Sequence, residues 1–265
     1  MSSSRHTRST HSFRVFTPTI LSSSNGTRCA PAPSPGQAGG VQTTYPQRAR
    51  MTPGQQRAWE RSWGRWGEDV VDLPDGPLDV AGWFGRAAPV VLEIGSGMGE
   101  STASMAIDAP GVDHLAVEVY RPGLAQLLLR IEQAGITNLR LLRGDAHALL
   151  AEHVAPSGLH AVRIYFPDPW PKRRHHKRRL VRPELVALVA SRLTLGGTLH
   201  LATDWVPYAE EMLAVCAAEP ALRNTVGDSS PDGFATRPTW RPVTKFEQRA
   251  RDEGRVVRDL LFVRV

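Results

Sequence analysis

Short apolar runs alternate with amphipathic stretches along the chain from residue 52 onward. The apolar runs predict seven β-strands, at residues 89–94, 115–119, 138–142, 159–166, 198–203, 221–226 and 256–265. The stretches between them carry apolar residues three or four positions apart, which is the spacing of one helix face. Strands that alternate with helices predict an α/β fold, in which right-handed crossovers build a doubly wound, mostly parallel sheet.

Several of the predicted helices have recognisable ends. Residues 52–55, Thr-Pro-Gly-Gln, form a capping box with proline at the first helical position. Trp59, Trp63 and Trp66 then follow on one helix face. A tryptophan stripe at this spacing is typical of core packing, so we expect these rings to be buried. The pair Gly196-Gly197 is expected to end a later helix.

Residues 1–48 differ from the rest of the chain, because they are rich in Ser, Thr, Pro and Gly and show no sustained periodicity. We predict a disordered tail there, followed by one domain at residues 49–265. The first 50 residues contain six arginines and no lysine or acid, which accounts for the formal net charge of +6. An organelle transit peptide would share this composition. The excess of arginine over lysine instead favours a GC-rich bacterial genome and a dispensable tail.

The composition excludes several classes of protein. Of 265 residues, 41% are hydrophobic, yet no apolar run is long enough to span a bilayer. The two cysteines are Cys29 in the tail and Cys216 at an apolar position of a predicted helix, and they indicate neither a disulfide framework nor a metal site. We therefore expect a cytoplasmic protein without metal or membrane association. The sequence leaves open whether it is a monomer or a homodimer.

The segment from Arg163 to Arg179 carries the most informative chemistry. An apolar run ends there in Pro-Asp-Pro-Trp-Pro at residues 167–171, where the proline rings fix φ and predict a rigid turn. Seven of the eleven residues at 172–182 are cationic and none is acidic. A carboxylate and an aromatic ring beside such a patch indicate an enzyme that meets a base on a polyanion. The alternative is a solvated basic loop at the end of a strand.

A second candidate site is the turn Gly95-Ser96-Gly97-Met98-Gly99 after the first predicted strand. Glycines let a backbone turn sharply and approach a cofactor closely. A dinucleotide site would require glycine where this chain has Glu100, and a carboxylate there would repel a pyrophosphate. The spacing, preceded by Glu93, instead resembles motif I of the class I S-adenosylmethionine-dependent methyltransferases, whose cofactor carries a cationic sulfonium and a cationic amino group.

Two acids at later strand ends support the same interpretation. Glu118 ends the second predicted strand, at the place where an acid binds ribose hydroxyls in this architecture. Asp145 follows the third strand, where its carboxylate can accept a hydrogen bond from the adenine amino group. The alternatives are an exposed loop acid in each case or, for Asp145, a helix N-cap.

Three further motifs narrow the resemblance. Residues 166–172, Phe-Pro-Asp-Pro-Trp-Pro-Lys, with the basic run that follows them, resemble the signature of the bacterial tRNA (guanine-N7-)-methyltransferases. So do Thr-Asp-Trp at 203–205 and Thr-Lys-Phe-Glu at 244–247. The resemblance covers roughly residues 52–265. It implies a class I methyltransferase fold, S-adenosylmethionine as cofactor and the variable loop of tRNA as target.

The resemblance also implies the residues of the site. The cofactor-binding residues are Glu93, Gly95, Gly97, Gly99, Glu118, Asp145 and Asp168. The nucleoside-binding residues are Lys172, Asp204, Thr244, Lys245, Phe246 and Glu247. The RNA-binding residues are Arg174, His175, His176, Lys177, Arg178 and Arg179. Thr244 and Glu247 also match a capping box, and both roles are compatible.

The target atom sets the chemistry that these residues must provide. Guanine N7 has an in-plane lone pair and no proton, so its methylation requires no general base. It requires in-line positioning and surroundings that tolerate positive charge on the base. Asp168 is the candidate catalytic residue in that electrostatic role, with Trp170 as a candidate packing partner for the base.

Two other functions stay open. One is another S-adenosylmethionine-dependent RNA methyltransferase, although an enzyme that modifies an exocyclic amine would be expected to carry Asn/Asp-Pro-Pro-aromatic. The other is a non-catalytic RNA-binding protein on the same fold, which would not need Glu93, Glu118 and Asp145 together.

Overall fold

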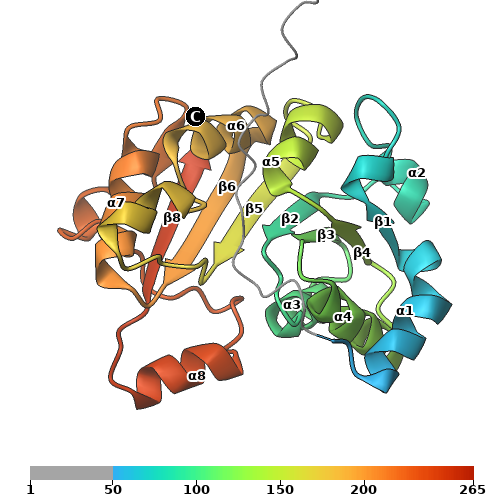
Figure 1. Cartoon of the computed structure of the whole chain (residues 1–265). Helices are drawn as coiled ribbons and strands as arrows, with labels where there is room; N and C mark the ends of the chain where they lie inside the picture. The colour runs from blue at the N-terminus through green and yellow to red at the C-terminus, as the bar shows by residue number, and fades with distance from the viewer. Residues whose placement is uncertain (1–49) are drawn as a thin grey trace, which may run out of the picture. The chain divides into compact units, whose positions relative to one another are not determined.

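The computed structural model describes residues 50–265, which form an α/β fold around a central sheet (Figure 1). The strands are β1 (Gly67–Asp69), β2 (Val90–Ile94), β3 (Asp113–Glu118), β4 (Leu139–Arg143), β5 (Leu159–Tyr165), β6 (Leu193–Thr203), β7 (Leu222–Asn224) and β8 (Arg258–Arg264). The α-helices are α1 (Pro53–Trp66), α2 (Val80–Phe84), α3 (Glu100–Asp108), α4 (Arg121–Ala134), α5 (Ala146–Ala148), α6 (Pro183–Arg192), α7 (Val206–Ala217) and α8 (Lys245–Asp252). The predicted tail at residues 1–48 lies outside the described residues.

The strand order of the sheet is β1-β4-β3-β2-β5-β6-β8-β7. Strands β1 to β6 pair in parallel, and β8 is antiparallel to both β6 and β7. The strand order reverses between β2 and β5. From β2 the chain adds β3 and β4 on one side of the sheet, and it then returns to add β5, β6 and β8 on the other side. The predicted doubly wound, mostly parallel sheet is confirmed. In such sheets ligands bind beyond the carboxyl ends of the strands at the reversal.

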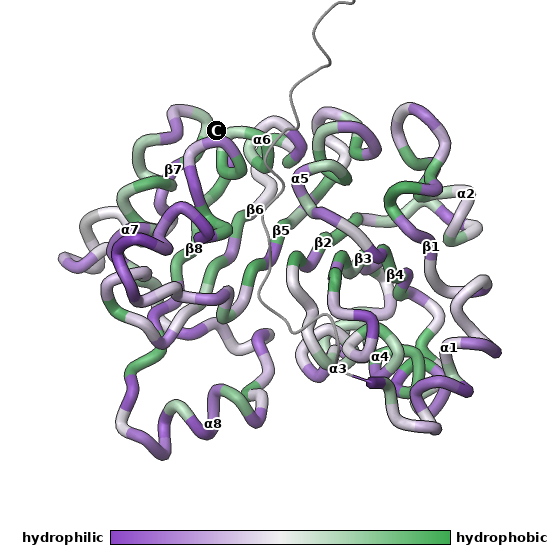
Figure 2. The backbone as a smooth tube through the Cα atoms, viewed as in Figure 1, coloured by the Kyte–Doolittle hydropathy of each residue, from purple (hydrophilic) through white to green (hydrophobic). Residues whose placement is uncertain are grey.

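Two buried apolar clusters pack helices against the sheet. One joins α1, α3 and α4 to β3 and β4, through residues that include Ala106, Leu128 and Leu141. The other joins α6 and α7 to the central strands, through residues that include Leu92 and Met212. Hydrophobic residues gather along β2, whereas hydrophilic residues predominate along α8 (Figure 2). No helix within residues 50–265 is long and apolar enough to cross a membrane.

The start of α1 is built as the sequence predicts. The Thr52 hydroxyl accepts a hydrogen bond from the Gln55 N–H, and the Gln55 side chain accepts one from the Thr52 N–H at 2.9 Å. Trp59 is buried and stacks on Trp63 with ring centroids 4.0 Å apart. Trp63 and Trp66 pack, partly buried, against the same apolar cluster. The interpretation of the tryptophan stripe as core packing is therefore confirmed.

Two details of the predicted elements are wrong. The sheet has an eighth strand, β1, which is too short to show a periodic pattern in the sequence. Gly196 and Gly197 do not end a helix, because α6 stops at Arg192 and both glycines lie within β6. The pairing of β5 with β6 is irregular at this point, and a Cβ at Gly197 would approach the carbonyl oxygen of Thr194 to 2.8 Å. The two glycines therefore allow the irregular pairing of β6 with β5 at this point.

A substitution in α4 tests how closely this helix packs on the glycine-rich turn. A Cβ added at Gly123 would overlap the carbonyl oxygen of Gly97. We expect Gly123→Ala to lower the free energy of unfolding, measured by urea denaturation, by about 1–3 kcal/mol through overpacking. Gly64 in α1 is the matched control because nothing lies near its Cβ position, and Gly64→Ala should stabilise by about 0.5–1 kcal/mol. Two similar stabilisations would contradict the close contact.

Candidate active site

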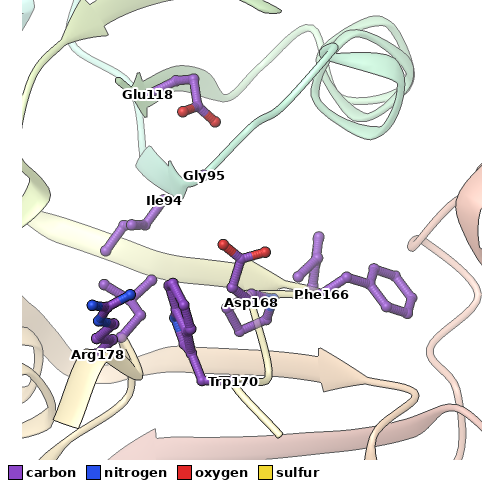
Figure 3. Close-up of a pocket in the computed structure, with 10 residues that line it drawn as sticks. Ile94, Gly95, Glu118, Phe166, Asp168, Trp170 and Arg178 are labelled. Atoms are coloured by element: carbon purple, nitrogen blue, oxygen red, sulfur yellow. The ribbon is translucent and has the colours of Figure 1, made fainter. Parts of the chain in front are cut away.

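A pocket lies at the carboxyl ends of β2, β3 and β5, where the strand order reverses. Its walls are formed by Ile94, Gly95, Glu118, Tyr165, Phe166, Pro167, Asp168, Trp170, Arg178 and Leu180. Figure 3 shows the carboxylates of Glu118 and Asp168 directed into the same space from opposite walls. Two of the acids that the sequence predicts to bind a cofactor therefore meet in one cavity.

The glycine-rich turn forms one wall and leads into α3. Gly95, Gly97 and Gly99 have φ values of +80°, +54° and +71°, in the left-handed region that disfavours residues with a Cβ. The Gly95 N–H donates a hydrogen bond to the carbonyl of Val117 on the neighbouring strand β3 at 2.9 Å. The backbone of this turn thus requires the Gly-x-Gly-x-Gly spacing itself.

Glu118 fastens the glycine-rich turn to the end of β3. Glu118 is buried, with only 5% of its surface exposed. One carboxylate oxygen accepts a hydrogen bond from the Gly97 N–H at 2.9 Å, and the other accepts from the N–H groups of Val119 and Tyr120 at 2.7 and 2.9 Å. A carboxylate offers about four acceptor positions, so one remains for a donor in the pocket.

Glu93 and Asp145, also predicted to bind the cofactor, are not among the residues that form the walls of this pocket. Glu93 is buried in β2, opposite Arg163 of β5. Burial raises the pKa of the Glu93 carboxyl to about 7, although the nearby Thr102 side chain and the charge of Arg163 oppose the shift. Asp145 accepts a hydrogen bond from the Ala148 N–H at 3.0 Å and thereby caps α5. Their contacts with a cofactor stay predictions.

The turn that carries Asp168 has an unusual backbone. Phe166 and Trp170, on either side of Asp168, have φ values of +50° and +43°, which non-glycine residues rarely adopt. The Phe166 N–H donates a hydrogen bond to the carbonyl of Ala202 at 2.7 Å, which ties the turn to β6. Such strained conformations persist only where surrounding contacts hold them, and they concentrate at functional sites. The prolines in the sequence predicted a rigid turn, but they did not predict the positive φ values of Phe166 and Trp170.

The basic run forms a short 3₁₀-helix at Arg173–Arg178 beside this turn. The side chains of the run that are exposed or partly exposed are Lys172, Arg173, Arg174, His175, His176, Lys177 and Arg178. Trp170 meets His175 edge-to-face at 5.7 Å, and the Arg178 guanidinium lies over the Trp170 ring at 4.9 Å. Trp170 therefore connects the cationic surface to the pocket wall. Among residues 50–265, no three His, Cys, Asp or Glu side chains form a group suited to a metal ion.

Arg179 is the exception within the basic run. It is only 1% exposed, so its predicted contact with RNA is contradicted. Its guanidinium donates to the carbonyl of Pro169 at 2.9 Å, forms an ion pair with Glu211 and lies 4.7 Å from the ring centroid of Tyr208. Arg179 therefore supports the Asp168 turn through the Pro169 carbonyl, and its own charge is balanced by Glu211 of α7.

The C-terminal motif lies next to the same turn. Phe246 is 52% exposed, and its ring centroid is 5.1 Å from that of Phe166. Thr244 caps α8 by accepting a hydrogen bond from the Glu247 N–H at 3.2 Å, which confirms the helix start. The Lys245 N–H donates to the Glu100 carboxylate at 3.3 Å, which links α8 to the start of α3. Phe246 thus packs on a residue of the pocket wall, and the binding of a nucleoside by Thr244, Lys245 and Phe246 stays a prediction.

Two predicted nucleoside-binding acids are already paired within the protein. Glu247 is 0% exposed and forms ion pairs with Arg237, Arg241 and Arg251, so the prediction that it touches substrate is wrong. Asp204 is largely buried and forms an ion pair with Arg255. These arginines were missed because they belong to no motif.

A family model for methyltransferases matches residues 87–260, well over half of the chain. The chain is 49% identical over 225 residues to the tRNA (guanine-N(7)-)-methyltransferase of Streptomyces avermitilis, which covers 85% of this chain and 76% of that protein. This chain belongs to the tRNA (guanine-N7-)-methyltransferase family. Family members from Streptomyces coelicolor and Bordetella pertussis are 50% and 49% identical, cover 85% and 87% of this chain, and are themselves covered to 81% and 87%. Among solved structures, the 16S rRNA methyltransferase KamB has a TM-score of 0.47 at 16% identity, covering 68% of this chain and 90% of that chain.

The hydrogen bonds of Glu118 predict how its loss would affect the binding of a cofactor in the pocket. Glu118→Ala leaves three backbone N–H groups without their acceptor. We expect the affinity for S-adenosylmethionine, measured by calorimetry without tRNA, to fall by about 1–3 kcal/mol. Glu68→Ala, at an exposed position of β1 on the sheet edge, is the control and should leave the affinity unchanged. Unaltered binding by the Glu118 variant would remove this residue from the cofactor site.

Proposed function

We propose that this protein transfers a methyl group from S-adenosylmethionine to N7 of a guanine in the variable loop of tRNA. The observation that carries the proposal is the pocket in which Glu118 and Asp168 face each other beside an exposed cationic loop. This arrangement combines a site for a cationic cofactor with a surface for a polyanion. The near-50% identity to tRNA (guanine-N7-)-methyltransferases over most of the chain supports the same activity.

The residues of the pocket fit S-adenosylmethionine better than a phosphate-bearing cofactor. Glu118 and Asp168 place negative charge in the pocket, and Glu100 adds another carboxylate at the start of α3. A pyrophosphate would be repelled at that helix N-terminus, whereas a sulfonium and an ammonium group would be attracted. When bound, S-adenosylmethionine supplies an electrophilic methyl group. We assign Glu118 to the ribose hydroxyls and the glycine-rich turn to the close approach of the cofactor.

Asp168 acts electrostatically in this proposal. The guanine N7 lone pair attacks without loss of a proton, so no residue of the chain needs to serve as a base. Positive charge develops on the imidazole ring of the base, and the Asp168 carboxylate stabilises it from a turn that needs no reorganisation. Phe246 and Trp170 offer aromatic surfaces on which the target base can stack.

The exposed cations determine which part of an RNA can reach the pocket. N7 faces the deep, narrow major groove of an A-form helix, which side chains do not enter. The target guanine must therefore lie in a loop or a tertiary junction, and the variable loop meets this requirement. Lys172, Arg174, Lys177 and Arg178 would bind the flanking phosphates. We propose a cytoplasmic location, where tRNA is available.

The electrostatic role of Asp168 has a measurable consequence. Asp168→Asn removes the charge and keeps the shape, so we expect the single-turnover rate to fall by about ten- to a thousandfold. The fold and most of the affinity for S-adenosylmethionine should remain. Asp108→Asn, an exposed substitution at the far end of α3, is the control and should not change the rate.

The pH dependence separates this role from general-base catalysis. Because N7 has no proton to lose, the wild-type single-turnover rate should show no tenfold rise per pH unit between about pH 6 and pH 9. A shallow change near pH 7 would instead come from the buried Glu93 carboxyl, whose pKa is raised to about 7. A rate that rises tenfold per pH unit through neutrality and loses this rise in Asp168→Asn would contradict the assignment.

The basic loop should govern the salt dependence of tRNA binding. Replacing Arg174 and Lys177 together by glutamine should raise the Michaelis constant for tRNA and lower the slope of log affinity against log salt by about 1.5, for two lost phosphate contacts. Arg223→Gln, at an exposed position of β7 on the far edge of the sheet, should leave the slope unchanged. If the double variant keeps the wild-type slope, RNA binds elsewhere.

A further inference from the structure

A buried network of charged side chains lies between the C-terminal segment and the sheet. Arg241 is at its centre and is only 1% exposed. Its guanidinium donates two hydrogen bonds to the carboxylate of Asp259 on β8, at 2.8 and 2.9 Å, and forms an ion pair with Glu247 of α8. Both carboxylates are buried as well, so each depends on a compensating charge in direct contact.

The network continues from Asp259 to the wall of the pocket. Asp259 Oδ1 lies 2.8 Å from His200 Nε2, and His200 Nδ1 lies 2.9 Å from the Tyr165 hydroxyl. Tyr165 lines the pocket, and the Arg241 guanidinium lies 5.8 Å from its ring centroid and 5.7 Å from that of Phe166. Burial lowers the pKa of His200 even though Asp259 opposes the shift, so the neutral imidazole extends the network without adding charge.

Helix α8 depends on this network because it has little apolar surface to bury. Hydrophilic residues predominate along it (Figure 2), and apart from one alanine its buried residue is Glu247. Glu247 pairs with Arg241 and also with Arg237 and Arg251, at 3.1 and 2.5 Å. Residues 244–246 cap and begin this helix, so the anchoring of Glu247 sets their position.

We propose that Arg241 is a positioning residue, which holds the segment 244–246 and the Asp168 turn in one fixed geometry. Arg241 reaches the segment through its ion pair with Glu247. It reaches the turn through its contact with Phe166, whose ring also packs on Phe246. The proposal rests on the function proposed above, since it takes the segment and the turn as the two sides of the guanine site.

The geometry explains why this position requires arginine. A planar guanidinium can bind one carboxylate with two N–H groups, bind a second with another N–H and still cover an aromatic ring with its face. A lysine ammonium keeps the charge but cannot make these contacts together. A lysine at this position would still balance the charge of the Glu247 and Asp259 carboxylates, but it would leave α8 free to shift relative to the Asp168 turn. Misplacement of a positioning group by about 1 Å can lower the rate roughly a hundredfold.

Arg241→Lys in the full-length protein tests the proposal. We expect the single-turnover rate of guanine-N7 methylation of unmodified tRNA to fall by about 10- to 100-fold. The Kd for S-adenosylmethionine, measured by calorimetry without tRNA, should not change. The matched control is Arg86→Lys, because Arg86 pairs with buried Asp113 at the amino end of β3, away from the pocket. This control should lower the Tm and leave the rate unchanged.

A second variant covers the case in which Arg241→Lys does not fold. Glu247→Gln keeps the shape of the side chain but weakens its ion pairs, and it should show the same loss of rate with unchanged cofactor affinity. Wild-type rates in a destabilised Arg241→Lys protein would overturn the proposal, as would failure of both variants to fold. A wild-type protein that forms no 7-methylguanosine would instead overturn the proposed function, and this inference with it.

Discussion

The parallel pairing of β2 with β5 is the constraint on which the site depends. This pairing sets Glu93 opposite Arg163, and the chain leaves both strands at the same edge of the sheet within three residues. The glycine-rich turn and the Asp168 turn therefore face each other across one pocket, although more than 60 residues separate them in the sequence. Because parallel strands end at a common edge, the pairing of β2 with β5 is by itself enough to bring the two turns together.

Charge is divided between the outside and the inside of the protein. In the basic run, Arg174, Lys177 and Arg178 are exposed, whereas Arg179 turns inward to Glu211 and the Pro169 carbonyl. One cation thus stabilises the strained turn while its neighbours remain available to phosphate. The strain at Phe166 and Trp170 is tolerable because contacts from β6 and α7 hold the turn on both sides.

The C-terminal segment follows a different physical principle from the rest of the fold. The helices α1 to α7 pack largely through the two apolar clusters, whereas α8 is fastened through ion pairs around Glu247. Directional ion pairs fix orientation more sharply than apolar contact does, but they fail when one partner is lost, since a buried charge is then left unpaired. This property suits the role proposed for residues 244–246, which is to place side chains beside the target base.

Local pattern alone determined the alternation of strands and helices, the cap at Thr52, the glycine-rich turn and the acid at Glu118, because each depends on neighbours a few residues away. The family resemblance predicted that the motifs at residues 166–172 and 244–247 belong to one site. Only the tertiary structure decided that Arg179 and Glu247 point inward, that Gly196 and Gly197 lie within a strand, and that Arg241 joins α8 to the pocket. Those outcomes depend on partners such as Glu211 and Asp259, and no local spacing encodes which distant charge will lie within contact.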